Sequence, residues 1–581
     1  ADATYKVDDN IDITVTFSEA VTKTGTPTLT LSNGATATYS SGDGSTALVF
    51  RYTVAEGNTD SADLSVSSYS GTLADSAGNA AAAVSGDLGA VIVDANSPSF
   101  VSVAAADATY KVDDNIDITV TFSEAVTKTG IPTLLLSNGA TATYSSGDGN
   151  TALVFRYTVA EGHADSTDLS VSSITATLAD SAGNSFAGTV SGDLGAVIVD
   201  ANSPASFTTG SITTSGGTVV SNYLNNTNDN IVVTVPIAND SSLNGGSIQL
   251  EISIDGGAYA NIGSPATIAG ANLGGTQNAT ITDNNVEALG AYAEGVALTF
   301  KAKLTDTAGN STTGGVSGTT ITVDQASPSV TLVSSNKLNG TYIKNQNIFV
   351  QVLFSENVIV NTTSGTPTLT LETGLSDADV NYSSGSGTVA LRYDYTILSG
   401  HNSSDLDYAS ENSLALNSGT IRDQSGNDAV LTLPSPGSSG SLSESKNIVI
   451  DTTNPSMTIS SSTVSSGSRT NDTSISLTFD SSEPTSNFIV TDIIVTNGSL
   501  TDFTPVDSST YTATFTPTTD GLTTINVPSN KFTDGASNSN LSADQFSWTF
   551  DSTSPTLTSV AAADATYKVD DNIDITVTFS E

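Results

Sequence analysis

The sequence predicts an all-β protein built from tandem sandwich domains, and three observations carry this prediction. Apolar and polar side chains alternate with a period of two, which is typical of strands with one buried face. Whole segments recur along the chain at intervals the size of a domain. At each interval an aspartate is followed four residues later by a proline, and proline blocks continuation of a strand.

The alternation is clearest in two stretches of the first repeat. Residues 11–17 read Ile-Asp-Ile-Thr-Val-Thr-Phe, and residues 48–54 read Leu-Val-Phe-Arg-Tyr-Thr-Val. Both predict strands with one apolar face, and Gly, Asn, Asp and Ser supply the turns between such stretches. No window carries a helical stripe, so we expect no substantial helix.

The repeats set the domain organisation. Residues 1–68 return at 106–173 with six differences, and residues 1–19 return unchanged at 563–581. A diverged copy starts near Pro328 and keeps Phe354-Ser355-Glu356. The sequence therefore reads as a window from a longer repetitive protein.

Five joint aspartates divide the chain, and the spacings between them are 106, 124, 127 and 100 residues. These lengths suit immunoglobulin-like sandwiches, which we expect in an elongated array. The domains are predicted at 1–97 (without its first strand), 98–203, 204–327, 328–454 and 455–554, with 555–581 as the start of another. The joint aspartates are Asp94, Asp200, Asp324, Asp451 and Asp551.

The charge balance excludes several function classes. Lys and Arg number 16 against 60 Asp and Glu, so the net charge is −44, and a basic footprint for nucleic acid is excluded. The chain has no cysteine, which excludes disulfides, thiolate zinc sites and thiol nucleophiles. No apolar run approaches the roughly 18 residues of a membrane span, so none is expected in this segment.

The order of motifs in the second repeat resembles a known family. Asp117 to Glu124, Pro132-Thr133-Leu134, Tyr144 to Gly147 and Asp180 to Asn184 follow one another as in bacterial Ig-like repeats of giant surface proteins. The repeat most similar to it is that of the swimming-motility surface protein of marine cyanobacteria. The resemblance covers domains one, two and four, about half of the chain. It implies an extracellular, modular and often calcium-binding stalk.

Acidic residues gather where domains meet. Each domain carries an Asp-x-x-Gly/Ser-Asn segment before its last strand, and a glutamate follows the second strand in the near-identical and diverged copies. In an Ig-like sandwich both loops face the preceding domain, whose joint aspartate arrives from the other side. Ca²⁺ takes about 6–8 oxygen ligands in irregular geometry, which suits such a set. The candidate metal ligands are Asp94, Asn96, Glu124, Asp180, Asp200, Asn202, Asp306, Asp324, Glu356, Asp423, Asp451, Asp534, Asp551 and Glu581.

Two points of this hypothesis stay open. The Asp-x-x-Gly-Asn segment also makes a good turn without any metal, because Asp and Asn bond their own backbone and Gly accepts φ > 0. The third domain offers no clear glutamate, and in the fifth either Asp480 or Glu483 could take that place.

Enzyme chemistry is not indicated. His163 and His401 occupy matching positions, but the first repeat has Asn58 there, so a catalytic base is disfavoured. The leading hypothesis is a calcium-stiffened structural segment of an adhesin stalk, surface layer or filament, outside the cell, whose partners are neighbouring repeats or copies of itself. The alternatives are a module that binds a glycan or a surface receptor, and a fibre subunit that polymerises by donor-strand exchange.

Overall fold

The computed structural model describes residues 2–580, and the chain divides into two compact units. One comprises residues 1–215 with 229–323, and the other comprises 216–228 with 324–581. Both are built of strands that form Ig-like sandwiches. The described helices are short: α1 (Asp283–Glu287), α2 (Leu442–Ser445) and three single 3₁₀ turns. The all-β prediction is confirmed, and these short segments are the helices found among the described residues.

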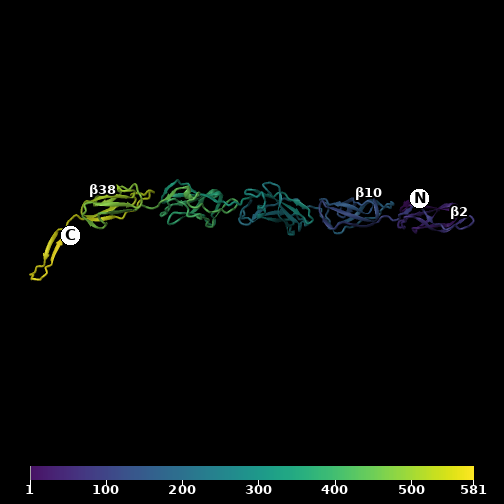
Figure 1. Cartoon of the computed structure of the whole chain (residues 1–581), viewed down its shortest axis with the longest axis horizontal. Helices are drawn as coiled ribbons and strands as arrows, with labels where there is room; N and C mark the ends of the chain where they lie inside the picture. Colours follow the sequence, from purple (N-terminus) through teal and green to yellow (C-terminus); the bar gives the residue numbers. More distant parts are fainter. Residues whose placement is uncertain (1, 581) are drawn as a thin grey trace. The chain divides into compact units, whose positions relative to one another are not determined.

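The first sandwich of unit one is purple in Figure 1, where β2 is labelled. Its main sheet runs β3-β4-β2-β5-β6, and β1 pairs with β7 in parallel. Ile11, Ile13 and Phe50 are buried, so the alternation of both predicted strands is confirmed. The strands are β1 (Ala3–Tyr5), β2 (Asn10–Leu31), β3 (Thr36–Ser41), β4 (Ser45–Thr53), β5 (Ser65–Asp75), β6 (Gly86–Asp87) and β7 (Val91–Val93).

The second sandwich repeats this plan and adds one strand, β8, which pairs with β10. This strand covers Val120 and Phe122, which are fully buried, whereas Val15 and Phe17 at the same places in the first sandwich are half-buried. The strands are β8 (Phe100–Ala104), β9 (Ala108–Tyr110), β10 (Asn115–Leu136), β11 (Thr141–Ser146), β12 (Asn150–Thr158), β13 (Ser170–Ala179), β14 (Gly192–Asp193) and β15 (Val197–Val199).

The third sandwich completes unit one with different sheets. One runs β16-β18-β21, and the other contains β24-β22-β19-β20 with β23 beside β22. The strands are β16 (Ile212–Ser215), β18 (Asn230–Pro236), β19 (Ser247–Ile254), β20 (Ala260–Thr267), β21 (Thr276–Thr282), β22 (Ala297–Thr305), β23 (Ser311–Thr313) and β24 (Ile321–Val323).

Unit two begins with the segment 216–228, which carries β17 (Tyr223–Leu224). Its Asn225 is fully buried and donates to the backbone oxygen of Ser425, which fixes this segment on the next sandwich. That sandwich contains β25 (Val330–Ser335), β26 (Gly340–Tyr342), β27 (Asn347–Asn361), β28 (Thr368–Leu371), β29 (Ala378–Ser384), β30 (Thr388–Thr396), β31 (Leu414–Ala415), β32 (Thr420–Arg422) and β33 (Ile448–Ile450).

The last full sandwich packs around Trp548 and Phe515, whose rings meet edge to face at 5.0 Å. It contains β34 (Met457–Ser461), β35 (Arg469–Thr470), β36 (Ile475–Ser481), β37 (Ile494–Thr496), β38 (Gly498–Pro505), β39 (Thr510–Pro517), β40 (Gly521–Asn526) and β41 (Phe546–Phe550). A hairpin of β42 (Leu557–Ala562) and β43 (Ile575–Phe579) follows, yellow in Figure 1.

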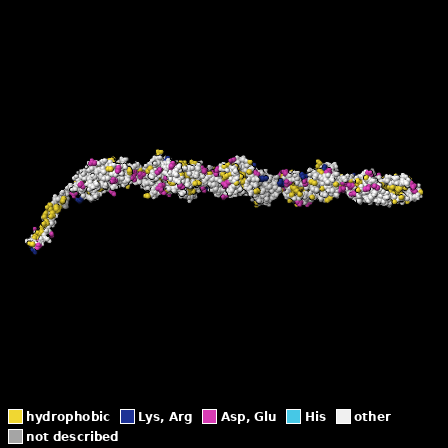
Figure 2. All heavy atoms as spheres, in the orientation of Figure 1, with side chains coloured by type: hydrophobic (Ala, Val, Ile, Leu, Met, Phe, Trp, Pro, Cys, Tyr) yellow, Lys and Arg dark blue, Asp and Glu magenta, His cyan; other side chains and the backbone are white. Residues whose placement is uncertain are grey.

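Backbone and uncharged polar side chains, drawn in white, cover most of the visible surface, with Asp and Glu scattered over it and few Lys or Arg (Figure 2). This agrees with the charge of −44, which comes from scarce bases rather than from one acidic tract. Among the residues that the structure describes, no helix is long and apolar enough to cross a membrane.

Candidate metal sites at the domain joints

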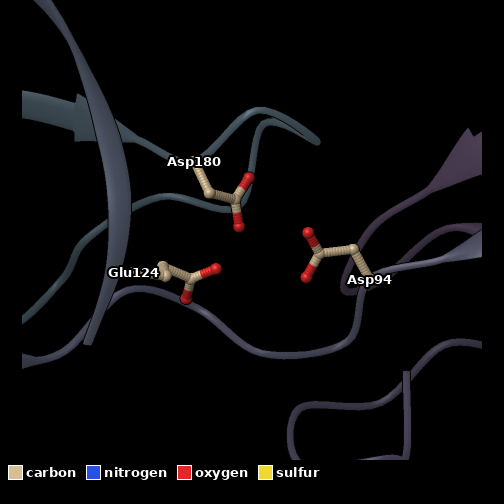
Figure 3. Close-up of side chains that lie close together, drawn as sticks. All are labelled: Asp94, Glu124 and Asp180. Atoms are coloured by element: carbon tan, nitrogen blue, oxygen red, sulfur yellow. The ribbon is translucent and has the colours of Figure 1, made fainter. Parts of the chain in front are cut away.

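Three sequence-distant carboxylates meet after the first sandwich. Asp94 follows β7, Glu124 lies on β10 and Asp180 follows β13, so one residue comes from the first sandwich and two come from the second. One oxygen from each lies within 4.8 Å of the others. Figure 3 shows the three carboxylates directed toward one another. Asp180 is buried, and the other two are half-buried.

The same arrangement recurs twice in unit two. Each set combines a joint aspartate, a carboxylate from the loop or strand after it, and a buried aspartate from the Asp-x-x-Gly/Ser-Asn turn. The two further triads are Asp324–Glu356–Asp423 and Asp451–Glu483–Asp534. In the third triad Glu483 takes the glutamate's place, while Asp480 lies exposed on β36 and is not part of the triad.

The turn itself positions the buried aspartate. Asp180 Oδ1 accepts hydrogen bonds from the backbone N–H groups of Gly183 (2.7 Å) and Asn184 (2.8 Å). Gly183 has φ +93°, a region where a Cβ would be strained. Asp180 Oδ2 accepts from Asn184 Nδ2 at 2.8 Å. The turn interpretation and the metal hypothesis are therefore compatible. The hydrogen bonds of the turn hold the Asp180 carboxylate in a fixed position, and a metal ion would be an additional partner for it.

The turn asparagine also ties the two sandwiches together. Asn184 Nδ2 donates to the backbone oxygen of Asp94 at 3.1 Å, and Asn184 Oδ1 accepts from the backbone N–H of Val7 at 2.7 Å. Asn310 does the same with Asp200 and Val112. In unit two, Asn427 bonds Asp324 and Asn226, and Asn538 bonds Asp451. Each of these bonds joins the turn of one sandwich to the segment before it.

The carboxylates of a triad repel one another. Burial, followed by the charges of Asp180 and Asp94, raises the pKa of Glu124 to about 7. Burial and Asp180 also raise the pKa of Asp94. At the third triad, burial and a hydrogen bond with Asp534 raise the pKa of Glu483 to about 7. A shared cation would relieve this repulsion, because opposite charge favours the ionised carboxylate.

The donor set fits a hard divalent cation. Three carboxylates, with carbonyl oxygens and water to complete the shell, suit Ca²⁺, which accepts oxygen ligands in flexible geometry. A cavity of about 470 Å³ lies beside the third triad and is lined by Asp451, Glu483 and Asp534 among others. The chemistry that such a site supports is cross-linking of two domains through one ion.

Some predicted ligands lie apart from the triads. The side-chain amides of Asn96 and Asn202 donate to Asp60 and Asp165, at 2.8 Å in each case. Asp551 lies 3.4 Å from Arg469 in an ion pair, and its expected partner Glu581 is outside the described residues. Asp200 and Asp306 belong to none of the three triads, although the charge of Asp306 contributes to the raised pKa of Asp200.

Sequence reasoning missed two further acids at the first joint. Glu56 accepts from the backbone and hydroxyl of Ser97, and Asp60 accepts from the backbone of Ala95, so both hold the joint segment. Their charges also contribute to the raised pKa of Glu124. The signal was present in the sequence, because Glu161 and Asp165 repeat both residues.

The histidines have structural partners. His163 Nδ1 lies 3.0 Å from the hydroxyl of Tyr157, and Asn58 makes the equivalent bond to Tyr52 at 2.9 Å. His401 pairs in the same way with Tyr395 at 2.8 Å. These contacts tether a loop, and the chain is built of Ig-like repeats, which are structural modules rather than enzymes.

Comparisons with known proteins agree with the fold. Residues 451–550 match the family model described as "Bacterial Ig-like domain". No curated protein sequence matched the chain. A solved structure from a 1.5-MDa bacterial ice-binding adhesin is 14% identical, with 61% of this chain and 98% of that chain covered and a TM-score of 0.27. Invasin, a bacterial integrin-binding protein, is also 14% identical (61% and 64% covered, TM-score 0.19), and a titin fragment is 11% identical (56% and 97% covered, TM-score 0.21).

Proposed function

We propose that this chain is a structural segment of an extracellular bacterial surface protein, of the adhesin-stalk type, and that Ca²⁺ at its joints restricts motion between neighbouring domains. The fold, the family match at residues 451–550 and the resemblance of domains one, two and four to repeats of giant surface proteins support the structural part. The neighbouring repeats are the partners, and no separate ligand is required.

The recurrence of the triad carries the calcium part. Three joints place three carboxylates within 4.8 Å of one another. The fifth sandwich departs from the repeat and uses Glu483, two residues beyond the end of β36, whereas Glu124 lies within β10. A turn alone requires only its own Asp and Asn, so it gives no reason for two further carboxylates to approach at the cost of mutual repulsion.

The mechanism is electrostatic. Without a cation the triad carboxylates favour separation, which loosens the joint, while the hydrogen bonds of the turn asparagine still link the turn to the preceding segment. Ca²⁺ would neutralise the repulsion and bind one side chain from the first sandwich and two from the next. A chain of such joints would become stiffer in calcium-rich surroundings than in a calcium-poor compartment.

The test uses the whole chain in millimolar Ca²⁺ and in excess chelator. We expect small-angle scattering to give a narrower distribution of inter-domain distances with Ca²⁺, and thermal unfolding to move to higher temperature. Asp180→Asn should reduce both effects, because Asn keeps the turn's acceptor and removes the charge. Asp75→Asn is the matched control, since Asp75 holds an equivalent turn but belongs to none of the three triads. Identical scattering and melting in both conditions would overturn the calcium part and leave the fold unaffected.

A further inference from the structure

The second joint contains a buried carboxylate oxygen with no partner. Asp306 is 4% exposed, and its Oδ2 has no hydrogen-bond partner among the described residues. The equivalent oxygens of Asp180, Asp423 and Asp534 each accept from the asparagine of their own turn, at 2.8, 2.8 and 3.0 Å. A buried polar atom without a partner costs free energy, so a ligand for this oxygen is expected.

The rest of the Asp306 turn is intact, so the unpartnered oxygen is not a sign of a broken loop. Oδ1 accepts from the backbone N–H groups of Gly309 at 2.7 Å and Asn310 at 2.8 Å. Asn310 Nδ2 reaches across to the backbone oxygen of Asp200 at 3.1 Å. The turn therefore has the geometry of the other joints, and only Oδ2 is left over.

A third acid stands where the other repeats have their glutamate. Asp240 follows β18 after the short stretch 237–239, as Glu124 follows the second predicted strand of its repeat. Its loop lies on the Asp306 turn, because Ser242 O accepts from Thr307 N at 3.1 Å and from Thr307 Oγ1 at 3.2 Å. Asp240 Oδ1 accepts from Ser242 N at 2.9 Å and from Ser242 Oγ at 2.8 Å.

Asp200 completes the set from the preceding sandwich. Burial raises its pKa, and the charges of Asp306, Asp165 and Asp240 raise it further. The three oxygens are spread more widely than those of the triads, since the set does not meet the 4.8 Å spacing of the other three groups.

We propose that Asp200, Asp240 and Asp306 form a fourth Ca²⁺ site, in which Asp306 Oδ2 and Asp200 bind the ion directly and Asp240 binds it through water. Ca²⁺ sites commonly include such a water-mediated carboxylate. The inference rests on the proposed calcium function. The sequence predicted Asp200 and Asp306 as ligands, and the packing of the Asp240 loop on the Asp306 turn adds Asp240 to them. The wider spacing makes this the weakest of the four sites.

The test counts Ca²⁺ ions bound to the full chain by equilibrium dialysis. We expect four ions for the parent chain and three for Asp306→Asn, which keeps the Oδ1 acceptor of the turn. The variant Asp180→Asn/Asp423→Asn/Asp534→Asn should still bind one ion, and adding Asp240→Ala should weaken that last site about tenfold or more. Asp75→Asn should leave the count at four.

The outcomes separate the two proposals. A parent chain that binds three ions, with Asp306→Asn also binding three, overturns the fourth site and leaves the proposed function standing. A parent chain that binds none overturns both. If a multiple variant does not fold, as judged by its circular dichroism and melt, the single variant Asp306→Asn still decides the question.

Discussion

Asn184 donates its side-chain N–H to the backbone oxygen of Asp94 over 3.1 Å, although the two residues are 90 positions apart. The same asparagine accepts from Val7 at 2.7 Å and holds the Asp180 carboxylate at 2.8 Å. One side chain thus joins the preceding sandwich to the acidic triad. The joint therefore has a neutral hydrogen-bonded contact beside a cluster of three carboxylates.

Asn184→Ala should loosen the first joint whether or not calcium is present. The change leaves the Val7 N–H and the Asp94 oxygen without their partner, at a cost of about 1–2 kcal/mol. Hydrogen exchange at Val7 should become faster, and the scattering profile should broaden. Asn79→Ala is the matched control, because Asn79 bonds only the exposed Asp75 of its own turn. Equal effects of the two substitutions would contradict the role of Asn184 as an inter-domain contact.

In the absence of Ca²⁺ the stability of the joints should rise as the pH falls from about 7 toward 4.5. Glu124 and Glu483 have folded-state pKa values raised to about 7 from 4.5, so the folded state binds their protons before the unfolded state does. Protonation removes the repulsion among the carboxylates, and the gain in the free energy of unfolding is complete below pH 4.5. Urea unfolding at several pH values measures the slope.

Glu124→Gln should reduce the dependence of stability on pH, because the neutral glutamine side chain does not titrate. Saturating Ca²⁺ should flatten it as well, since the ion stabilises the charged form. If the metal-free chain became less stable as the pH was lowered from 7 to 5, the result would contradict the raised pKa values of Glu124 and Glu483.

Glu483→Gln should remove one bound Ca²⁺ from the full chain and lower the calcium-induced rise in the melting temperature of the fifth sandwich. Glu483 lies within 4.8 Å of Asp451 and Asp534, whereas Asp480 is exposed on β36. Asp480→Asn removes the same charge three residues away and should leave the count unchanged. Titration calorimetry of both variants checks this, and a loss of one ion in Asp480→Asn alone would reverse the assignment.

His163→Asn should be nearly neutral, whereas His163→Leu should destabilise the second sandwich by about 1 kcal/mol. The first repeat already carries Asn58 at this place, and its Oδ1 accepts from Tyr52 and from the backbone of Ala55. Leucine offers no acceptor to Tyr157 or Ala160. Thermal melts of the two variants check this prediction. Equal melting temperatures for His163→Asn and His163→Leu would contradict the role of His163 in tethering the loop.

The sequence by itself determined the secondary structure and the turns. Period-two alternation at residues 11–17 and 48–54 depends only on which side chains must leave water, and the strands β2 and β4 follow it. The Asp180 turn was also predictable, because its hydrogen bonds connect residues within five positions. The joint aspartates were visible as repeats and supplied one member of each triad, and the repeated turn aspartates supplied another.

Tertiary structure decided which acids meet. Glu483, two residues beyond the end of β36, joins the third triad, whereas Asp480 lies exposed on β36, and no local sequence pattern distinguishes the two. Asp240 was missed because the third domain departs from the repeat, so only the packing of its loop on the Asp306 turn shows where it lies. Strand identity is a local property of alternating side chains, whereas the meeting of carboxylates some 30 to 100 residues apart depends on how sheets and neighbouring domains pack.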